Sequence, residues 1–124
     1  MNIVDSCGWF EWFTNGGLAD QYKAYLVDQD NLLVPSIVLY EVYKVLKREA
    51  GEEKALLAAG YMKRSPVIAL DETLSLAAAD MALKEGLAMA DAIVLATAQA
   101  NGCTIITSDV DLKGRPDVNY LPKH

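Results

Sequence analysis

The sequence has little of the chemistry that proteins most often use at catalytic sites. It contains one histidine, at position 124, and two cysteines without the CxxC spacing of a metal finger or redox pair. Catalytic triads that need histidine, and zinc sites ligated by it, are excluded unless the terminal residue supplies the imidazole. Two thiols also make a disulfide scaffold a poor interpretation. Any catalytic chemistry is therefore expected to depend on carboxylates.

Long apolar runs and a basic leader are also missing. No apolar run approaches the roughly 18 residues needed to cross a bilayer. No basic stretch precedes the first apolar residues, as it does in a signal peptide. We therefore expect a cytoplasmic protein without membrane association. Hydrophobic residues make up 52% and charged residues 23% of the chain, which is typical of one globular domain spanning residues 1–124.

Basic residues are too few to offset the acidic ones. Seventeen Asp and Glu residues accompany 11 Lys and Arg residues, and the formal net charge at pH 7 is −6. A protein that binds nucleic acid by charge alone is normally basic. Either nucleic acid is not the ligand, or bound cations change the local charge.

Four short apolar runs are continuous rather than alternating, which is typical of parallel strands covered on both faces. They span residues 3–4, 32–34, 67–70 and 104–107, and residues 118–121 offer a fifth, edge strand. Helices are expected over residues 8–13, 18–28, 35–50, 52–64, 72–85 and 90–100. This alternation predicts an α/β three-layer sandwich around a mostly parallel sheet of four to five strands.

Acidic residues follow several of the predicted strands, where open α/β sheets bind their ligands. Asp5 follows the first run, and Asp109 and Asp111 follow the fourth. Each also has a simpler interpretation as a helix cap or turn residue. Asp71 follows the third run, but a helix begins directly after it, so capping accounts for it.

Two further acids lie in apolar helical stretches. Glu41 lies within a stripe of valines, where a carboxylate needs a cation, a hydrogen-bond network or a raised pKa. Pairing with Lys44 or Lys47 is the alternative. Asp91 is the only charge in residues 90–98, although a position at the helix N-terminus would also favour an acid there.

Taken together, these acids indicate a metal site. Carboxylates brought from distant segments to one end of a sheet repel one another unless cations lie between them. Ligation by oxygen alone favours Mg²⁺ or Mn²⁺ over zinc. Such clusters serve phosphoryl chemistry, in which metals activate water and stabilise the attacking and leaving oxygens.

Four short stretches, in their order and spacing, resemble the PIN-domain family of ribonucleases, and within it the VapC-type toxins of toxin–antitoxin pairs. The stretches are Ile3-Val4-Asp5-Ser6, Pro35-Ser36 through Glu41, Ala90-Asp91-Ala92 and Thr107-Ser108-Asp109-Val110-Asp111. The resemblance implies that the catalytic and metal-binding acids are Asp5, Glu41, Asp91 and Asp109. It also implies supporting roles for Ser6, Thr107 and Asp111. Leu112 stands where many members carry an aromatic residue.

The activity implied by the resemblance is endonucleolytic cleavage of RNA that depends on Mg²⁺ or Mn²⁺. Lys44, Lys47 and Arg48 follow Glu41 on one predicted helix, where they are either contacts to flanking phosphates or a solvated basic face. The resemblance also implies a homodimer and a small antitoxin protein as partner. The aromatic residues at positions 9, 10, 12 and 13 are expected to be mostly core, with the remainder in a partner groove.

Two other interpretations stay open. The chain could be a catalytically silent PIN-like binding or scaffold module, but such a module has no physical need to keep mutually repelling carboxylates. It could also be a receiver-type phosphoacceptor, with Asp71 as the acceptor. Against the receiver, Asp5 lacks a neighbouring acid and no lysine closely follows the fourth strand.

Overall fold

The chain alternates short strands with helices, and the structure, a computed structural model, describes residues 1–123. The strands are β1 (Asn2–Val4), β2 (Val34–Pro35), β3 (Val67–Ile68), β4 (Thr104–Thr107) and β5 (Val118–Tyr120). The helices are α1 (Ser6–Phe13), α2 (Ala19–Leu26), α3 (Ser36–Ala50), α4 (Glu52–Met62), α5 (Glu72–Glu85) and α6 (Met89–Asn101). Two 3₁₀ turns, η1 (Gln29–Asn31) and η2 (Val110–Leu112), complete the elements. The predicted α/β class is confirmed.

All strand pairings are parallel. One ladder has the order β1-β4-β5 and a second joins β2 to β3. A single parallel bridge between Asn2 and Leu32 connects the two ladders. The five strands therefore run in one direction in the order β3-β2-β1-β4-β5, and their carboxyl ends share one edge.

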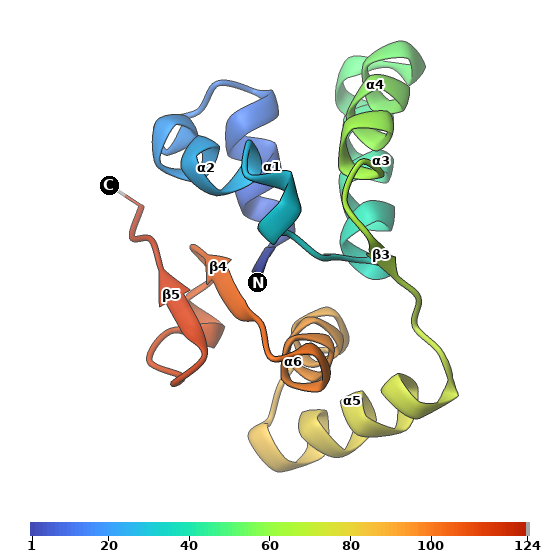
Figure 1. Ribbon diagram of the computed structural model, residues 1–124, viewed down its shortest axis with the longest axis vertical. Helices are drawn as coiled ribbons and strands as arrows, with labels where there is room; N and C mark the ends of the chain where they lie inside the picture. The colour runs from blue at the N-terminus through green and yellow to red at the C-terminus, as the bar shows by residue number, and fades with distance from the viewer. Residues whose placement is uncertain (124) are drawn as a thin grey trace.

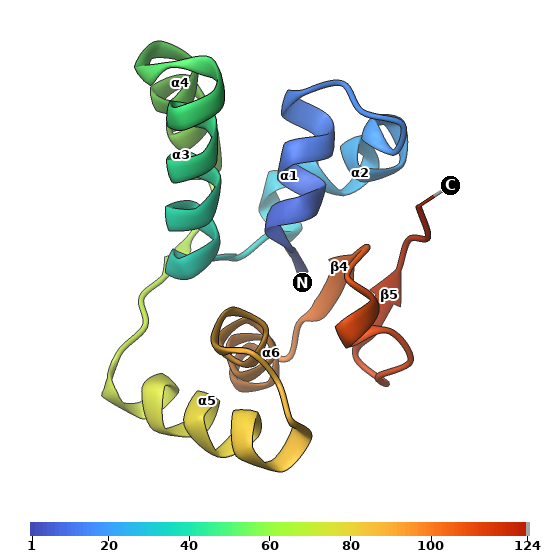
Figure 2. The same cartoon turned by 180° about the vertical axis from the view of Figure 1, so that it is seen from behind.

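Helices cover the sheet from two sides. In Figure 1 the pair α1–α2 lies on one side of β4 and the pair α5–α6 on the other. The pair α3–α4 stands beside α1, as the reverse view in Figure 2 also shows. The sheet and its two helical layers form the three-layer arrangement that the sequence predicts.

The core forms where the central strands meet these helices. Ile3 and Ile105, paired across β1 and β4, are fully buried. In α6 every residue from 92 to 98 is buried, which confirms that this apolar helix is packed on nearly all sides. Among residues 1–123, no helix combines the length and apolar character needed to cross a membrane.

One expectation about the strands is wrong. Residues 67–70 were expected to form a strand covered on both faces, but β3 ends at Ile68, and Val67 is 38% exposed. The reason is that β3 lies at an edge of the sheet and pairs only with the two-residue strand β2. β2 is itself short because α3 begins at Ser36, directly after Pro35.

Two helix boundaries follow the predicted signals closely. Gly51 separates α3 from α4 and has φ of 94°, a conformation that residues with a Cβ rarely adopt. Asp71 is the N-cap of α5, and its carboxylate accepts a 2.9 Å hydrogen bond from the N–H of Leu74. The structure confirms Asp71 as a capping residue.

Candidate metal centre

Asp5 lies at the carboxyl end of β1 and is 6% exposed. Its carboxylate accepts hydrogen bonds from the N–H of Ser6 at 2.8 Å and from the hydroxyl of Thr107 at 3.0 Å. Asp5 is also the N-cap of α1. The capping and site interpretations of Asp5 are therefore compatible, because each oxygen of the carboxylate has its own protein donor.

Asp109 follows β4 and lies beside Asp5 because of the strand register. The pairing of Val4 with Ile106 brings the ends of β1 and β4 together. The N–H of Asp109 donates to the Thr107 hydroxyl at 3.0 Å, so this threonine contacts both acids. Asp109 also caps η2 by accepting from the N–H of Asp111 at 2.9 Å.

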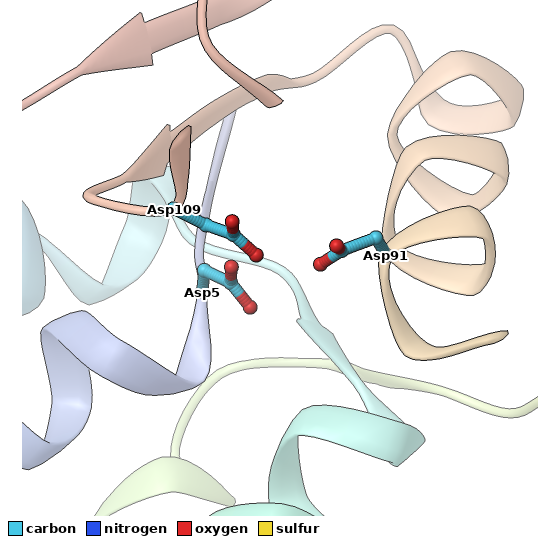
Figure 3. Close-up of side chains that lie close together, drawn as sticks. All are labelled: Asp5, Asp91 and Asp109. Carbon is cyan, nitrogen blue, oxygen red and sulfur yellow. The ribbon is translucent and has the colours of Figure 1, made fainter. Parts of the chain in front are cut away.

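Asp91 reaches the same point from another part of the fold. It lies in the first turn of α6, directly before the buried stretch that runs from residue 92 to residue 98. One carboxylate oxygen from each of Asp5, Asp91 and Asp109 lies within 4.8 Å of the other two. Figure 3 shows the three side chains pointing toward one another from β1, α6 and the segment after β4. We call these three residues the aspartate cluster.

Burial and neighbouring acidic charges raise the pKa values of two members of the aspartate cluster, Asp5 and Asp91. Burial raises the pKa of Asp5, and the charge of Asp109 raises it further, while the hydrogen bonds from Ser6 and Thr107 lower it. Burial, hydrogen bonding to Asp109 and the nearby acidic charges raise the pKa of Asp91 to about 7. Without a cation, the cluster therefore holds a proton more readily than isolated aspartates do.

Glu41 lies on α3, beside the aspartate cluster. It is half-buried and lines the same pocket as the three aspartates. Burial raises the pKa of Glu41 and the charge of Asp5 adds to this, while Lys44 and the Ser6 hydroxyl partly offset the increase. Glu41 does not belong to the group of oxygens that lie within 4.8 Å of one another.

The pocket above the aspartate cluster has a volume of about 390 Å³. Its lining residues are Asp5, Ser6, Cys7, Glu41, Ala90, Asp91, Ser108, Asp109, Val110 and Lys123. The clustered donors are carboxylate oxygens, and within the described residues none of the three aspartates forms an ion pair with a basic side chain. Such a donor set fits a hard divalent cation such as Mg²⁺ or Mn²⁺.

Of the three residues with expected supporting roles, two lie at the pocket and one does not. Ser6 lines the pocket and Thr107 lies buried beneath it. Asp111 is exposed and does not line the pocket, although its charge contributes to raising the pKa of Asp91.

The three basic candidates on α3 are exposed. Lys44 lies over the ring of Tyr40 and close enough to Glu41 to lower its pKa. Lys47 pairs with Glu52 at 3.4 Å, and Arg48 pairs with Glu49 at 2.9 Å. None of the three lines the pocket, so their contact with RNA stays a prediction.

Sequence reasoning assigned no role to five residues that line the pocket, namely the apolar Ala90 and Val110 and the polar Cys7, Ser108 and Lys123. Cys7 and Ser108 lie next to recognised residues in the chain, but neither residue type by itself indicates a role there. Lys123 arrives at the pocket from beyond β5. The segment before it is held in place by a 2.8 Å hydrogen bond from the N–H of Leu121 to the carbonyl oxygen of Thr107.

The aromatic segment of α1 is mainly core, as expected. Trp9 is 2% exposed, and its partly buried neighbours pack against the same core. Phe13 also lines a second pocket of about 560 Å³, between the end of α1 and the pair α3–α4. A partner in that pocket stays a prediction.

The family of this chain follows from a comparison of its sequence with models of known families. The model of the PIN domain matches residues 3–117, which include the whole aspartate cluster. The chain belongs to the PIN domain family. PIN domains are nuclease domains, and the aspartate cluster occupies the carboxyl end of the sheet in this one. A comparison with curated protein sequences finds no significant match.

Solved PIN structures have the same fold. A toxin–antitoxin complex from Klebsiella pneumoniae matches with a TM-score of 0.80 and 22% identity, covering 96% of each chain. The sarcin–ricin loop cleaving toxin VapC20 of Mycobacterium tuberculosis matches with a TM-score of 0.75 and 17% identity, covering 91% of this chain and 92% of that one. The DNA-bound VapBC of Salmonella typhimurium matches with a TM-score of 0.76 and 14% identity, covering 98% and 96%. These similarities establish the fold.

Proposed function

We propose that this PIN domain is a divalent-metal-dependent endoribonuclease and the toxin of a toxin–antitoxin pair. The observation that carries the proposal is the convergence of three carboxylates, from three distant segments, within 4.8 Å of one another. In a nuclease family, such a site would hold Mg²⁺ or Mn²⁺ through Asp5, Asp91 and Asp109. Glu41 would ligate directly or through water. A bound divalent ion activates water for attack on phosphorus and neutralises charge on the phosphate.

The protein groups around the aspartate cluster have distinct tasks in this proposal. Two hydrogen bonds hold Asp5 in one orientation, and Thr107 sets its position relative to Asp109. The buried helix α6 presents Asp91 to the other two acids. This preorganisation keeps the three acids in place without further ordering when substrate binds.

Contacts to the RNA backbone are expected to be few. Lys123 lines the pocket and Lys44 lies beside Glu41, and both are exposed. The chain as a whole carries a net charge of −6. Because affinity for nucleic acid depends on the number of phosphates neutralised, we expect weak binding with a shallow dependence on salt. A steep dependence, typical of many contacts, would contradict this view.

The test of the nuclease is cleavage of RNA by the purified protein with Mg²⁺ or Mn²⁺. Asp5→Asn and Asp91→Asn are expected to abolish cleavage, because each removes a charged ligand. Asp71→Asn is the matched control, since asparagine caps helices as well as aspartate does and Asp71 caps α5. Cleavage that survives both cluster substitutions would overturn the nuclease. Loss of function in Asp71→Asn alone would support the receiver-type phosphoacceptor instead.

An antitoxin partner is supported by the structural neighbours, several of which are toxin–antitoxin complexes. In this chain, Leu76 and Leu83 on α5 are 70% and 87% exposed, which favours contact with another polypeptide. We propose a homodimer that binds a small antitoxin encoded beside it. Light scattering at micromolar concentration should give the mass of a dimer, and a stable monomer would contradict it. Co-expression with a neighbouring small reading frame should suppress RNA cleavage.

A further inference from the structure

Tyr22 lies on α2, outside every motif that indicates catalysis, yet its hydroxyl contacts the floor of the pocket. The side chain is fully buried. Its phenolic oxygen lies 2.6 Å from Oγ of Ser108 in a buried hydrogen bond and 3.8 Å from Sγ of Cys7. Both neighbours line the pocket that holds the aspartate cluster.

These contacts continue from Tyr22 to the clustered carboxylates. Sγ of Cys7 accepts from the N–H of Ser108 at 3.5 Å and lies 3.7 Å from Oγ1 of Thr107. Thr107 in turn donates to Asp5 and accepts from Asp109. Ser108 is the residue between Thr107 and Asp109, so its position affects the backbone that presents Asp109.

The backbone of α1 makes room for the Tyr22 ring. A Cβ at Gly8 would lie 2.5 Å from Cδ1 of Tyr22 and 2.5 Å from Cγ1 of Val4, and it would also clash with Cε1 of the ring. These separations are shorter than side-chain contacts allow, so glycine at this position is needed for the ring to pack as it does. The Tyr22 hydroxyl is thereby held at a defined point below the end of β4.

The hydroxyl itself needs an explanation beyond packing. Phenylalanine would fill the same space without burying a hydroxyl group, and a buried hydroxyl group that lacks a hydrogen-bond partner is destabilising. The short hydrogen bond to Ser108 offsets that destabilisation. Burial raises the pKa of Tyr22 above its ordinary value, so the phenol keeps its proton. A protonated phenol can donate to Ser108 and leave the serine hydroxyl proton free to point elsewhere.

We propose that Tyr22 is a positioning residue for the aspartate cluster. Its hydroxyl holds Ser108, and with it the turn from Thr107 to Asp109, so that the Asp109 carboxylate faces Asp5 and Asp91. The proposal rests on the proposed function in one respect, namely that the cluster binds a divalent ion. It assigns to α2, an element remote from the catalytic motifs, control over the affinity of the site.

The test is Tyr22→Phe, which removes only the hydroxyl. Mn²⁺ binding to the metal-free protein is measured by calorimetry, and RNA cleavage is measured as a function of Mn²⁺ concentration. Changing the groups that orient metal ligands typically lowers metal affinity 10–100-fold. Since Tyr22 acts through Ser108, we expect the smaller of these effects, which is a dissociation constant for Mn²⁺ about tenfold larger than that of the wild type. The lost cleavage rate should return at high Mn²⁺ concentration, with an unchanged KM for RNA.

Tyr61→Phe is the matched control. It also removes a tyrosine hydroxyl with a defined partner, because this hydroxyl donates to the carbonyl oxygen of Leu26 at 2.9 Å. Tyr61 does not line the pocket of the aspartate cluster. The control is expected to lower stability without changing Mn²⁺ affinity, which separates positioning from a general loss of stability.

Ser108→Ala probes the same hydrogen bond from its other partner and serves if Tyr22→Phe folds poorly. If both residues act through one bond, the double variant should bind Mn²⁺ no more weakly than the weaker single variant. The proposal would be overturned if the loss of Mn²⁺ affinity in the double variant equalled the product of the two single losses. It would also be overturned if Tyr22→Phe bound Mn²⁺ within twofold of the wild type. If the wild-type protein cleaves no RNA, the proposed function fails, but the Mn²⁺ titrations still decide the role of Tyr22.

Discussion

The hydroxyl of Thr107 donates a hydrogen bond to Oδ2 of Asp5 over 3.0 Å, joining two residues 102 positions apart in the chain. The parallel register of β1 and β4 places them side by side. The same hydroxyl oxygen accepts from the N–H of Asp109 at 3.0 Å. One side-chain oxygen thus fixes two of the three clustered carboxylates relative to each other.

Thr107→Val should damage both stability and activity. Valine keeps the shape but leaves the Asp109 N–H without its acceptor and removes one donor from Asp5. We expect the free energy of unfolding to fall by about 1–3 kcal/mol, and the rate of RNA cleavage to fall by about tenfold or more. Urea denaturation and a cleavage assay measure the two effects.

Thr97→Val is the control for that substitution. Thr97 is equally buried, but its hydroxyl donates to the carbonyl oxygen of Ile93 within α6, so its loss leaves no N–H unpaired. Its cleavage rate should match that of the wild type. Full activity in Thr107→Val would show that the hydroxyl is not needed to position the acids.

Asp91→Asn should stabilise the metal-free protein while it abolishes cleavage. The substitution removes a charge that Asp109 and Asp5 repel and that burial disfavours. We expect the free energy of unfolding at pH 7.5 to rise by about 1 kcal/mol in the presence of EDTA. In thermal melts, Mn²⁺ should raise the Tm of the wild type but not that of the variant. A lower Tm for the variant in EDTA would contradict the repulsion inferred here.

The stability of the metal-free protein should depend on pH through Asp91. Its pKa is raised to about 7 in the folded protein, whereas the pKa of an aspartate in an unfolded chain is about 4. Between these values the folded state retains a proton that the unfolded state has lost. The free energy of unfolding is therefore expected to fall as the pH rises from about 4 to about 7 and then to level off.

Thermal melts in EDTA at several pH values measure this dependence, with Asp91→Asn as the reference for all other groups. The variant should show a weaker decline than the wild type. The stabilisation of the protein by Mn²⁺ should show the opposite trend and increase as the pH rises, because cation and proton compete for the same carboxylates. Equal pH dependence in the two proteins would rule out Asp91 as the source.

Gly8→Ala should destabilise the protein strongly for a change of one methyl group. The added Cβ would collide with the Tyr22 ring and with Val4, and overpacking of this kind costs about 1–3 kcal/mol. Gly60→Ala is the matched control. Gly60 lies in the exposed face of α4 with no atom near its missing Cβ, so alanine should stabilise by up to about 1 kcal/mol. Chemical denaturation of both variants distinguishes the two sites.

The convergence of Asp5, Asp91 and Asp109 could be expected from the sequence only by taking the acids together, because each one alone also fits a helix cap or a turn. Asp91 is the single charge in an apolar helix, and the structure places that side chain at the pocket. Asp5 and Asp109 follow strands whose parallel pairing brings them together. The length of β3 was less predictable, since Val67 is apolar in sequence but lies at the exposed edge of the sheet.

The support beneath the acids left no comparable signal. Tyr22 and Ser108 are 86 positions apart, and their hydrogen bond depends on how α2 packs against α1. A buried tyrosine in an amphipathic helix is indistinguishable by pattern from any other core aromatic. Only the three-dimensional placement of Gly8 and Tyr22 reveals that the hydroxyl reaches the turn after β4.

The two ladders of the sheet are joined by an isolated bridge between Asn2 and Leu32 rather than by a continuous strand pairing. The strands β1 and β4, which present Asp5 and Asp109, lie on one side of this bridge. On the other side, β2 leads into α3, which carries Glu41 and Lys44. Few strand hydrogen bonds cross this junction, but Val38, Val42 and Leu46 of α3 are buried in the same core as Ile3 and Ile105, so side-chain packing holds α3 against the rest of the fold. The position of Glu41 at the pocket therefore depends on how the core side chains of α3 pack, whereas Asp5 and Asp109 are placed by the hydrogen-bonded register of β1 and β4.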